Sequence, residues 1–412
     1  MHRSDVLVIG GGQAGLAASF WLSARGIDHA VLERGRIGER WRTASWDSLR
    51  MQTPRWQSRL PGWSYTGPNV DGFMSIGELL AYLEGYARSF AAPLYGGIAV
   101  RAIAPAPDGY LVETDAGAWH ARAVILATGY CDRPAVPRFA HQLSPRVHQL
   151  VPASYRRPDE LPPGGVLVVG ASASGVLIAD ELRAAGREVT IAVGGHTRIP
   201  RRHLGRDIYW WLDVMGVLTE TVHDTHDLEA ARRQPSMQLV GDDSGRSLDL
   251  GTLRAAGVRL VGRMIDAGRE TIELADDLAA TTAAADARAS RLVARIDAFA
   301  EARELAPRGP AAAVTPIAPR SAPTRLSLAD ERISTVIWAT GFRRDYTWLR
   351  VPGVVAGAEL VHDGGVTPSP GLYALGLRFQ RRRNSSFLDG VGDDARAVVE
   401  HLARRLERRH AA

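Results

Sequence analysis

The chain repeats one local pattern, in which an apolar strand, a glycine turn, a helix and a second apolar strand follow one another. In the first copy the apolar run 5–9 leads into Gly10-Gly11-Gly12-Gln13-Ala14-Gly15, and an alanine-rich segment then continues to Arg25. Glycines at this spacing allow a tight turn, a close approach of the backbone to a pyrophosphate, and close packing of helix on strand. The free N–H groups and the positive dipole end of the helix N-terminus also favour phosphates. We therefore predict a dinucleotide site that includes Gly10, Gly12, Ala14 and Gly15.

An acid at the end of the second strand supports this interpretation. The strand 30–32 ends on Glu33, eighteen residues after Gly15, where a carboxylate can accept hydrogen bonds from a ribose diol. The segment 34–42 is rich in glycine and arginine; we expect its arginines to meet the pyrophosphate and Trp41 to lie against a flat ring system. The alternative is a solvated loop with one packed tryptophan. The ligand residues predicted here are Glu33, Arg34, Trp41 and Arg42.

The second copy has its first strand at 166–169 and its second strand at 189–193, with the turn Gly170-Ala171-Ser172-Ala173-Ser174-Gly175 between them. No acid stands at the position that matches Glu33, and arginines follow instead. A carboxylate would repel a 2′-phosphate and arginines would bind it, so this copy favours NADPH over NADH. Its predicted ligand residues are Gly170, Ser172, Ser174, Gly175, Arg198 and Arg201.

Two further strands run into the same three small residues. The apolar strand 124–126 leads into Ala127, Thr128 and Gly129, and the strand 334–338 leads into Ala339, Thr340 and Gly341. Open α/β sheets bind nucleotides at the carboxyl edge of their strands, where small residues bring the backbone close to a ligand. We therefore expect both strand ends to contribute to the cofactor sites.

Composition excludes several kinds of chemistry. The 412 residues contain no lysine, which removes Schiff-base chemistry, pyridoxal phosphate anchoring and P-loop phosphate transfer. The 50 arginines are scattered and matched by 45 acids, so the net charge of +5 indicates a solvated surface with a few phosphate contacts, and we expect no nucleic-acid partner. Cys131 is the single cysteine, so one chain cannot form a disulfide framework, a zinc site or a redox pair.

The first strand begins by Asp5, and no apolar run approaches the ~20 residues that span a membrane. We therefore expect a cytoplasmic protein without a membrane partner. A long surface helix is predicted over 276–305, followed by a proline-rich loop over 307–323. A homodimer is compatible with the sequence, which does not demonstrate one.

The order of these motifs resembles that of class B flavin-dependent monooxygenases, a group that includes flavin-containing monooxygenases, Baeyer–Villiger enzymes and YUCCA enzymes. The resemblance covers nearly the whole chain. The segments that carry it, besides the two glycine turns, are Gly38-Glu39-Arg40-Trp41-Arg42, Trp46-Asp47-Ser48-Leu49-Arg50, Thr53-Pro54, Leu60-Pro61-Gly62, Gly205-Arg206-Asp207, Trp338-Ala339-Thr340-Gly341-Phe342, Trp348-Leu349 and Gly390-Val391-Gly392-Asp393-Asp394-Ala395.

The resemblance implies an α/β fold with two dinucleotide-binding domains. The FAD domain would comprise residues 1–150 and 331–412, and the NADPH domain, residues 151–330 with a helical insertion, would be inserted into it. FAD would bind at the first glycine turn and NADPH at the second, with the flavin ring between the domains. The final helix N-terminus near Gly392 would stabilise charge on the reduced flavin.

In such enzymes NADPH reduces the flavin, and O₂ then forms a C4a-peroxyflavin that passes one oxygen atom to a small organic substrate at nitrogen, sulfur or carbon. This activity is our leading prediction. The alternatives are an NAD(P)H-dependent flavin oxidase, reductase or dehydrogenase, and a non-catalytic protein that senses NADP(H) or redox state. No catalytic acid or base stands out in the sequence.

One family motif is altered. The fingerprint F-x-G-x-x-x-H-x-x-x-[Y/F] is expected just before the second glycine turn, but when Tyr155 is aligned with its aromatic residue, Val151 occupies the position of the histidine. His148 lies three residues too early, and we interpret it as a surface or linker side chain. Gly195 also stands where close relatives often carry an arginine. The altered motif is the reason for keeping the oxidase alternative.

Overall fold

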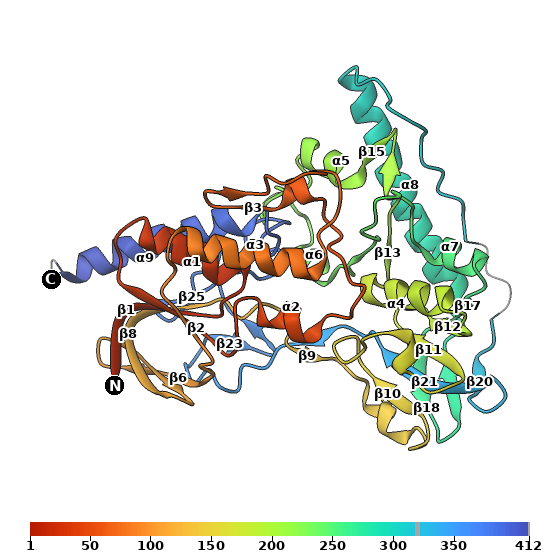
Figure 1. Ribbon diagram of the computed structural model, residues 1–412, viewed down its shortest axis with the longest axis horizontal. Coiled ribbons are helices and arrows are strands. Elements are labelled where there is room, and N and C mark those ends of the chain that lie inside the picture. Colours follow the sequence, from red (N-terminus) through yellow and green to blue (C-terminus); the bar gives the residue numbers. More distant parts are fainter. Residues whose placement is uncertain (318–321, 411–412) are drawn as a thin grey trace.

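The computed structural model describes residues 1–317 and 322–410, with the side chains of the last helix described as far as Arg408. Two sheets with parallel strands lie beside each other, each with helices packed on it, and the α8 helix projects from the second unit (Figure 1). The predicted α/β fold with two dinucleotide-binding units is confirmed. Part of the predicted proline-rich loop, 318–321, lies outside the described residues.

The first sheet contains the first glycine turn. In its parallel part β1 pairs with β2 and β8, and β25 pairs with β8, whereas β6, β7 and β8 form an antiparallel meander. Its strands, in spatial order, are β5 (Leu94–Gly96), β2 (His29–Glu33), β1 (His2–Ile9), β8 (Gly117–Leu126), β7 (Gly109–Thr114) and β6 (Val100–Ala106), with β25 (Leu372–Ala374) on β8.

Alternation along β1 gives this sheet two buried faces. Val6 and Val8 pack into the cluster that contains Leu16 and Leu402, whereas Leu7 and Ile9 pack into a separate cluster on the opposite face. The helices on the first face are α1 (Gln13–Ser23), α3 (Ile76–Ser89) and α9 (Val391–His410). A capping box starts α3, in which Ser75 accepts from the Glu78 N–H and the Glu78 carboxylate accepts from the Ser75 N–H.

The second sheet is entirely parallel. Its strands, in spatial order, are β10 (His148–Leu150), β21 (Ile333–Trp338), β11 (Gly165–Val169), β12 (Val189–Ala192) and β17 (Arg259–Val261). Thus β10 and β21 belong to the second sheet although they lie beyond the expected domain limits at residues 150 and 330. Pairing across the sheet places these two strands in the second unit, and the local sequence does not specify this pairing.

The insertion of the second unit follows β17. It contains the small sheet β18 (Met264–Ala267), β19 (Thr271–Leu274) and β20 (Arg325–Ser327), and between β19 and β20 the helix α8 (Leu278–Ala302), which confirms the long helix predicted from the sequence. Ile296 and Ala300 of α8 are buried with Trp211 of α5 (Ile208–Val214). This packing holds the far end of α8 against the part of the chain that follows the second glycine turn.

The remaining elements include α4, the helix of the second glycine turn, and several short helices and strands. They are α2 (Glu39–Ala44), β3 (Arg59–Leu60), β4 (Trp63–Ser64), β9 (Arg133–Pro134), α4 (Ala173–Ala184), β13 (Thr197–Arg198), β14 (Arg202–His203), β15 (Arg206–Asp207), α6 (Leu228–Arg233), β16 (Met237–Gln238), α7 (Leu250–Ala255), β22 (Phe342–Arg343), β23 (Val355–Ala356), β24 (Glu359–Leu360) and the 3₁₀ helices η1 (Arg55–Gln57), η2 (Arg138–Gln142) and η3 (Pro158–Glu160).

Gly15 provides a test of this packing, because a Cβ atom there would lie 1.8 Å from the carbonyl oxygen of Gly10. We expect Gly15→Ala to lower the stability of the protein by about 1–3 kcal/mol, the usual range for overpacking. Gly77→Ala is the matched control, since its nearest contact would be 3.9 Å away. Thermal unfolding of both variants measures the difference, and an equal midpoint for the two would contradict the prediction.

Candidate active site

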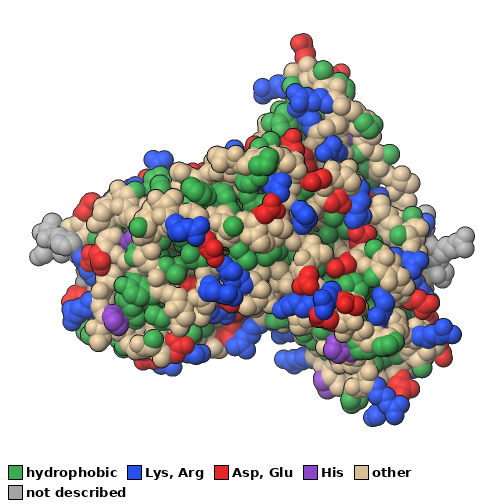
Figure 2. Space-filling model, viewed as in Figure 1, with side chains coloured by type: hydrophobic (Ala, Val, Ile, Leu, Met, Phe, Trp, Pro, Cys, Tyr) green, Lys and Arg blue, Asp and Glu red, His purple; other side chains and the backbone are tan. Residues whose placement is uncertain are grey.

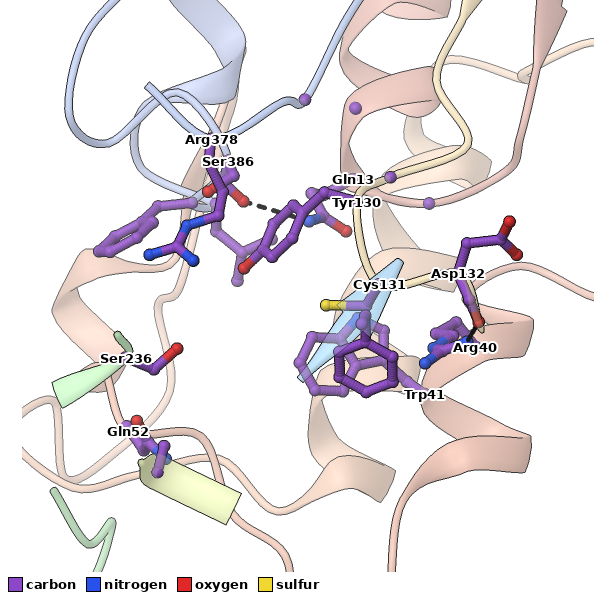
Figure 3. A pocket seen from close by; sticks show the side chains of 18 of the residues that line it. Gln13, Arg40, Trp41, Gln52, Tyr130, Cys131, Asp132, Ser236, Arg378 and Ser386 are labelled. Atoms are coloured by element: carbon purple, nitrogen blue, oxygen red, sulfur yellow. Dashed lines mark hydrogen bonds between the residues drawn. The ribbon is translucent and has the colours of Figure 1, made fainter. Parts of the chain in front are cut away.

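A cavity of about 1530 Å³ connects the two glycine turns. Gly10 and Gly12 line it on one side, and Ala173 and Ser174 at the start of α4 line it on the other. Figure 3 shows part of this cavity, with side chains from several separate segments around one open space. Ligands bound at the two turns would therefore extend into the same space.

The first turn is in direct contact with the end of β8. Gly10 has a φ of +115°, and a Cβ atom there would lie 2.5 Å from the carbonyl oxygen of Ala127. Ala127 follows β8, the parallel neighbour of β1, so Thr128 and Gly129 are also brought to the cavity. At Gly12, by contrast, nothing lies within 4 Å of an added Cβ atom, which leaves room for phosphates at the start of α1.

Two backbone hydrogen bonds hold the Glu33 carboxylate in place at the cavity. It is buried, and its two carboxylate oxygens accept hydrogen bonds from the backbone N–H groups of Gly11, at 2.7 Å, and Gly35, at 3.1 Å. Each oxygen of a carboxylate can accept a second hydrogen bond. Because Glu33 also lines the cavity, these remaining positions are available to a ribose diol.

Some residues of the loop after Glu33 line the cavity, and others contact the surrounding protein. Arg34 and Trp41 line the cavity, whereas Arg42 forms an ion pair with Glu84 of α3 and donates to the carbonyl oxygen of Ile37. Arg40, which the sequence did not single out as a ligand, also lines the cavity and donates to the carbonyl oxygen of Asp132 (Figure 3). The predicted role of Arg42 at the pyrophosphate is therefore not supported by its contacts.

Tyr130 and Cys131 lie at the cavity directly after the Ala-Thr-Gly segment. Burial raises the pKa of the Tyr130 phenol to about 12 and raises the pKa of the Cys131 thiol. Both groups are therefore neutral at neutral pH, and Tyr130 can donate a hydrogen bond. The Arg378 guanidinium lies 5.7 Å from the Tyr130 ring, and both side chains point into the open space (Figure 3). This part of the cavity combines a neutral phenol with a cation.

The second turn repeats the geometry of the first. Gly170 has a φ of +112°, and a Cβ atom there would lie 2.4 Å from the carbonyl oxygen of Ala339, which follows β21. At Gly175 a Cβ atom would lie 2.0 Å from the carbonyl oxygen of Gly170, just as Gly15 meets Gly10. Ser172 is the N-cap of α4, with an extended backbone. The residues present therefore fit a second dinucleotide.

The two arginines predicted to bind a 2′-phosphate are buried in ion pairs. Arg198 donates to Asp249 at 2.7 Å and to Asp286 at 2.5 Å, and both carboxylates are buried with it. Arg201 pairs with Asp207 and lies 4.4 Å from the ring of Phe73. These carboxylates already neutralise both guanidinium groups, so the geometry opposes the predicted role.

The predicted residues divide into two sets with respect to the cavity. Those that line it are Gly10, Gly12, Ala14, Glu33, Arg34, Trp41, Ala127, Thr128, Gly129, Ser174 and Arg198. Those that do not line it, within residues 1–317 and 322–410, are Gly15, Arg42, Gly170, Ser172, Gly175, Arg201, Thr340, Gly341 and Gly392. Gly392 instead packs on Pro61, and its carbonyl oxygen accepts from the Trp21 indole, so the structure gives no direct support for its predicted role at the flavin.

Several cavity residues were missed by the sequence interpretation. Tyr130 and Cys131 follow a recognised strand end, and Arg378 follows the glycine after β25, so position after a strand could have indicated them. Gln52 and Ser236 come from irregular segments that carry no such signal (Figure 3).

His148 bears on the altered family motif. It lies on the edge strand β10, it is exposed, and it is not among the described residues that line the cavity. Its interpretation as a surface side chain is confirmed. His148 therefore does not take the place of the fingerprint histidine at the cavity.

Known proteins show where this architecture belongs. A family model of pyridine nucleotide-disulphide oxidoreductases matches residues 7–211. An uncharacterized CzcO-like oxidoreductase of Geobacillus kaustophilus is 32% identical over 404 residues, which cover 97% of this chain and 99% of that protein. This chain belongs to the CzcO-like oxidoreductases. Its enzyme class, oxidoreductase, follows from this membership.

Two further similarities confirm the predicted resemblance to class B flavin-dependent monooxygenases. The indole-3-pyruvate monooxygenase YUCCA1 of Oryza sativa is 27% identical over 294 residues, or 66% of this chain and 72% of that protein. The flavin-containing monooxygenase from Stenotrophomonas maltophilia has a TM-score of 0.68 at 22% identity, with 98% of this chain and 99% of that chain covered.

In the described part of this CzcO-like chain, no helix is long and apolar enough to cross a membrane.

The ion pairs of Arg198 predict a large effect on stability. Replacing it by alanine leaves two buried carboxylates without their cation, which costs about 3–5 kcal/mol of unfolding free energy. Arg101→Ala is the control, because its partner Asp115 and its own side chain are exposed and such pairs contribute about 0–1 kcal/mol. Denaturant unfolding compares the two variants. Equal losses would show that Arg198 is not a structural cation.

Proposed function

We propose that this CzcO-like protein is an FAD- and NADPH-dependent monooxygenase that transfers one oxygen atom from O₂ to a small organic substrate at nitrogen, sulfur or carbon. The observation that carries the proposal is the single cavity shared by the two glycine turns. A nicotinamide bound at the second turn and a flavin bound at the first can meet there. The flavin-containing monooxygenase neighbour and the YUCCA relative support this activity.

Bound FAD would supply the redox and oxygen chemistry, and the chain would supply binding and orientation. In the first site the turn at Gly10 and Gly12 and the N-terminus of α1 hold the pyrophosphate, and Glu33 binds the adenosine ribose. Trp41 forms part of the wall against the ring system. Burial at Tyr130 keeps its phenol protonated, so it can donate a hydrogen bond to cofactor or substrate without removing a proton.

We propose that the second unit binds NADPH at the turn Gly170–Gly175, with its pyrophosphate at the start of α4. The division into an FAD domain with an inserted NADPH domain is part of this proposal, with β10 and β21 assigned to the inserted domain because they pair in its sheet. A homodimer and a cytoplasmic location remain predictions from the sequence.

A second candidate is an NAD(P)H-dependent flavin oxidase, reductase or dehydrogenase. The observation that favours it is the exposed position of His148 on β10, away from the cavity, together with Val151 at the expected histidine position. A protein of this kind would reduce O₂ to hydrogen peroxide without transferring oxygen to a substrate. A binding protein without turnover is the third alternative.

The deciding measurement uses the FAD-loaded protein with NADPH, ¹⁸O₂ and a panel of small amines, thioethers and ketones. We expect NADPH to bleach the flavin and one ¹⁸O atom to enter a product, detected by mass spectrometry. Stoichiometric hydrogen peroxide with no labelled product would establish the oxidase alternative. A flavin that neither NADPH nor NADH reduces would leave only the non-catalytic alternative.

Gly12→Val provides the matched variant for the first site. An added Cβ atom at Gly12 meets nothing within 4 Å, so we expect the variant to fold with a thermal midpoint close to that of the parent. The side chain would fill the space beside the α1 N-terminus, and we expect at least tenfold less bound FAD, measured by absorbance after gel filtration. Retention of a full complement of FAD would contradict the placement of the pyrophosphate.

A further inference from the structure

The loop that would contact the adenosine ribose of NADPH carries no cation of its own. It follows β12 and contains Gly194 and Gly195. At this position an acid would bind the 2′-hydroxyl of the ribose, or an arginine would bind a 2′-phosphate. An added Cβ atom at Gly195 would meet nothing within 4 Å. The loop therefore leaves open space at the position where a 2′-phosphate would be recognised.

Helix α8 of the insertion lies against this loop. Its Arg288 donates from Nη2 to the carbonyl oxygen of His196, at 2.9 Å. The next residues, Thr197 and Arg198, form β13, which packs against α8 (Figure 1). The Arg288 guanidinium is therefore fixed beside the ribose-reading loop although it lies far along the chain.

Arg288 differs from Arg198, Arg201 and Arg263 because no carboxylate of the described residues neutralises its charge. Arg198 and Arg201 are buried and neutralised by carboxylates. Arg263, whose Cδ would lie 4.0 Å from a Cβ atom at Gly194, pairs with Asp277 at 3.4 Å. Among the described residues Arg288 has no carboxylate within ion-pair distance, and the His196 carbonyl uses only one of its five N–H donors. Its charge is available to a ligand.

The same face of α8 lines the cavity. Arg288, Leu292 and Arg295 follow one another at helical spacing and contact the cavity that Ser174 and Leu177 of α4 also line. The pyrophosphate site at the start of α4 and the guanidinium on α8 thus border one space. A dinucleotide bound at α4 can reach Arg288 with its adenosine end.

We propose that Arg288 binds the 2′-phosphate of NADPH and gives this protein its preference for NADPH over NADH. The proposal rests on the NADPH site of the proposed function. A guanidinium can donate two parallel hydrogen bonds to a phosphate, whereas NADH offers only a 2′-hydroxyl at that position. The cation that the loop lacks is thus supplied by a helix of the insertion.

The test is calorimetric binding of NADP⁺ and NAD⁺ to the FAD-loaded protein, without turnover. We expect Arg288→Ala to weaken NADP⁺ binding by about 10- to 100-fold, the loss that corresponds to a charge-assisted hydrogen bond, and to leave NAD⁺ binding unchanged. Arg288→Lys is expected to retain part of the NADP⁺ affinity, since it keeps the charge and loses the bidentate geometry. Arg291→Ala is the matched control, because Arg291 is exposed on α8 and is not among the described residues of the cavity.

The outcomes separate the inference from the proposed function. If the parent protein binds neither NADP⁺ nor NAD⁺, the proposed function fails. If it binds NADP⁺ and Arg288→Ala changes both affinities equally or not at all, the proposed function stands and the role of Arg288 is overturned. A selective loss of NADP⁺ binding in Arg263→Ala but not in Arg288→Ala would assign the phosphate to Arg263 and also overturn it.

Discussion

The architecture depends on backbone contacts that only glycine permits. At Gly15 and Gly175 a Cβ atom would lie 1.8 and 2.0 Å from the carbonyl oxygen of the residue that starts the same turn. Without side chains at these points, α1 and α4 can begin directly at the carboxyl edges of their sheets. The start of each helix therefore lies at the cavity, where we propose that a pyrophosphate binds. The rest of each unit packs around this strand–turn–helix contact.

Arginine serves two separate purposes in a chain that has no lysine. Figure 2 shows arginine and acidic side chains interspersed over one face, and many of them form surface ion pairs of small individual effect. Arg198 instead ties the segment after the second turn to the distant Asp249 and Asp286 in buried pairs, and the buried Arg201 pairs with the nearby Asp207, so both arginines are structural. Arg288 and Arg378 line the cavity without a carboxylate partner among the described residues. The difference lies in their surroundings, since the residue type is the same.

The predictions from the sequence held where the pattern was local. The two turns and the long helix 278–302 are determined by spacing and periodicity within one segment. The local pattern did not indicate contacts whose partner comes from elsewhere in the chain. The strands β10 and β21 pair in the second sheet although they lie outside 151–330, and Tyr130 lines the cavity because β8 ends at the sheet edge where Gly10 lies.

The sequence by itself determined the two strand–turn–helix units of the dinucleotide-binding fold, because the strand, turn and helix of each unit are consecutive and their geometry depends on the glycines of the turn. The tertiary structure decided which arginines have a charge that no carboxylate neutralises. Arg198 stands in β13, directly after the loop where a phosphate ligand was expected, but its partners Asp249 and Asp286 lie 51 and 88 residues further along the chain. Arg288, on a helix that the sequence showed only as a surface element, is brought to the same loop. Whether the charge of an arginine is neutralised depends on the side chains that folding brings near it, and the local sequence pattern does not contain this information.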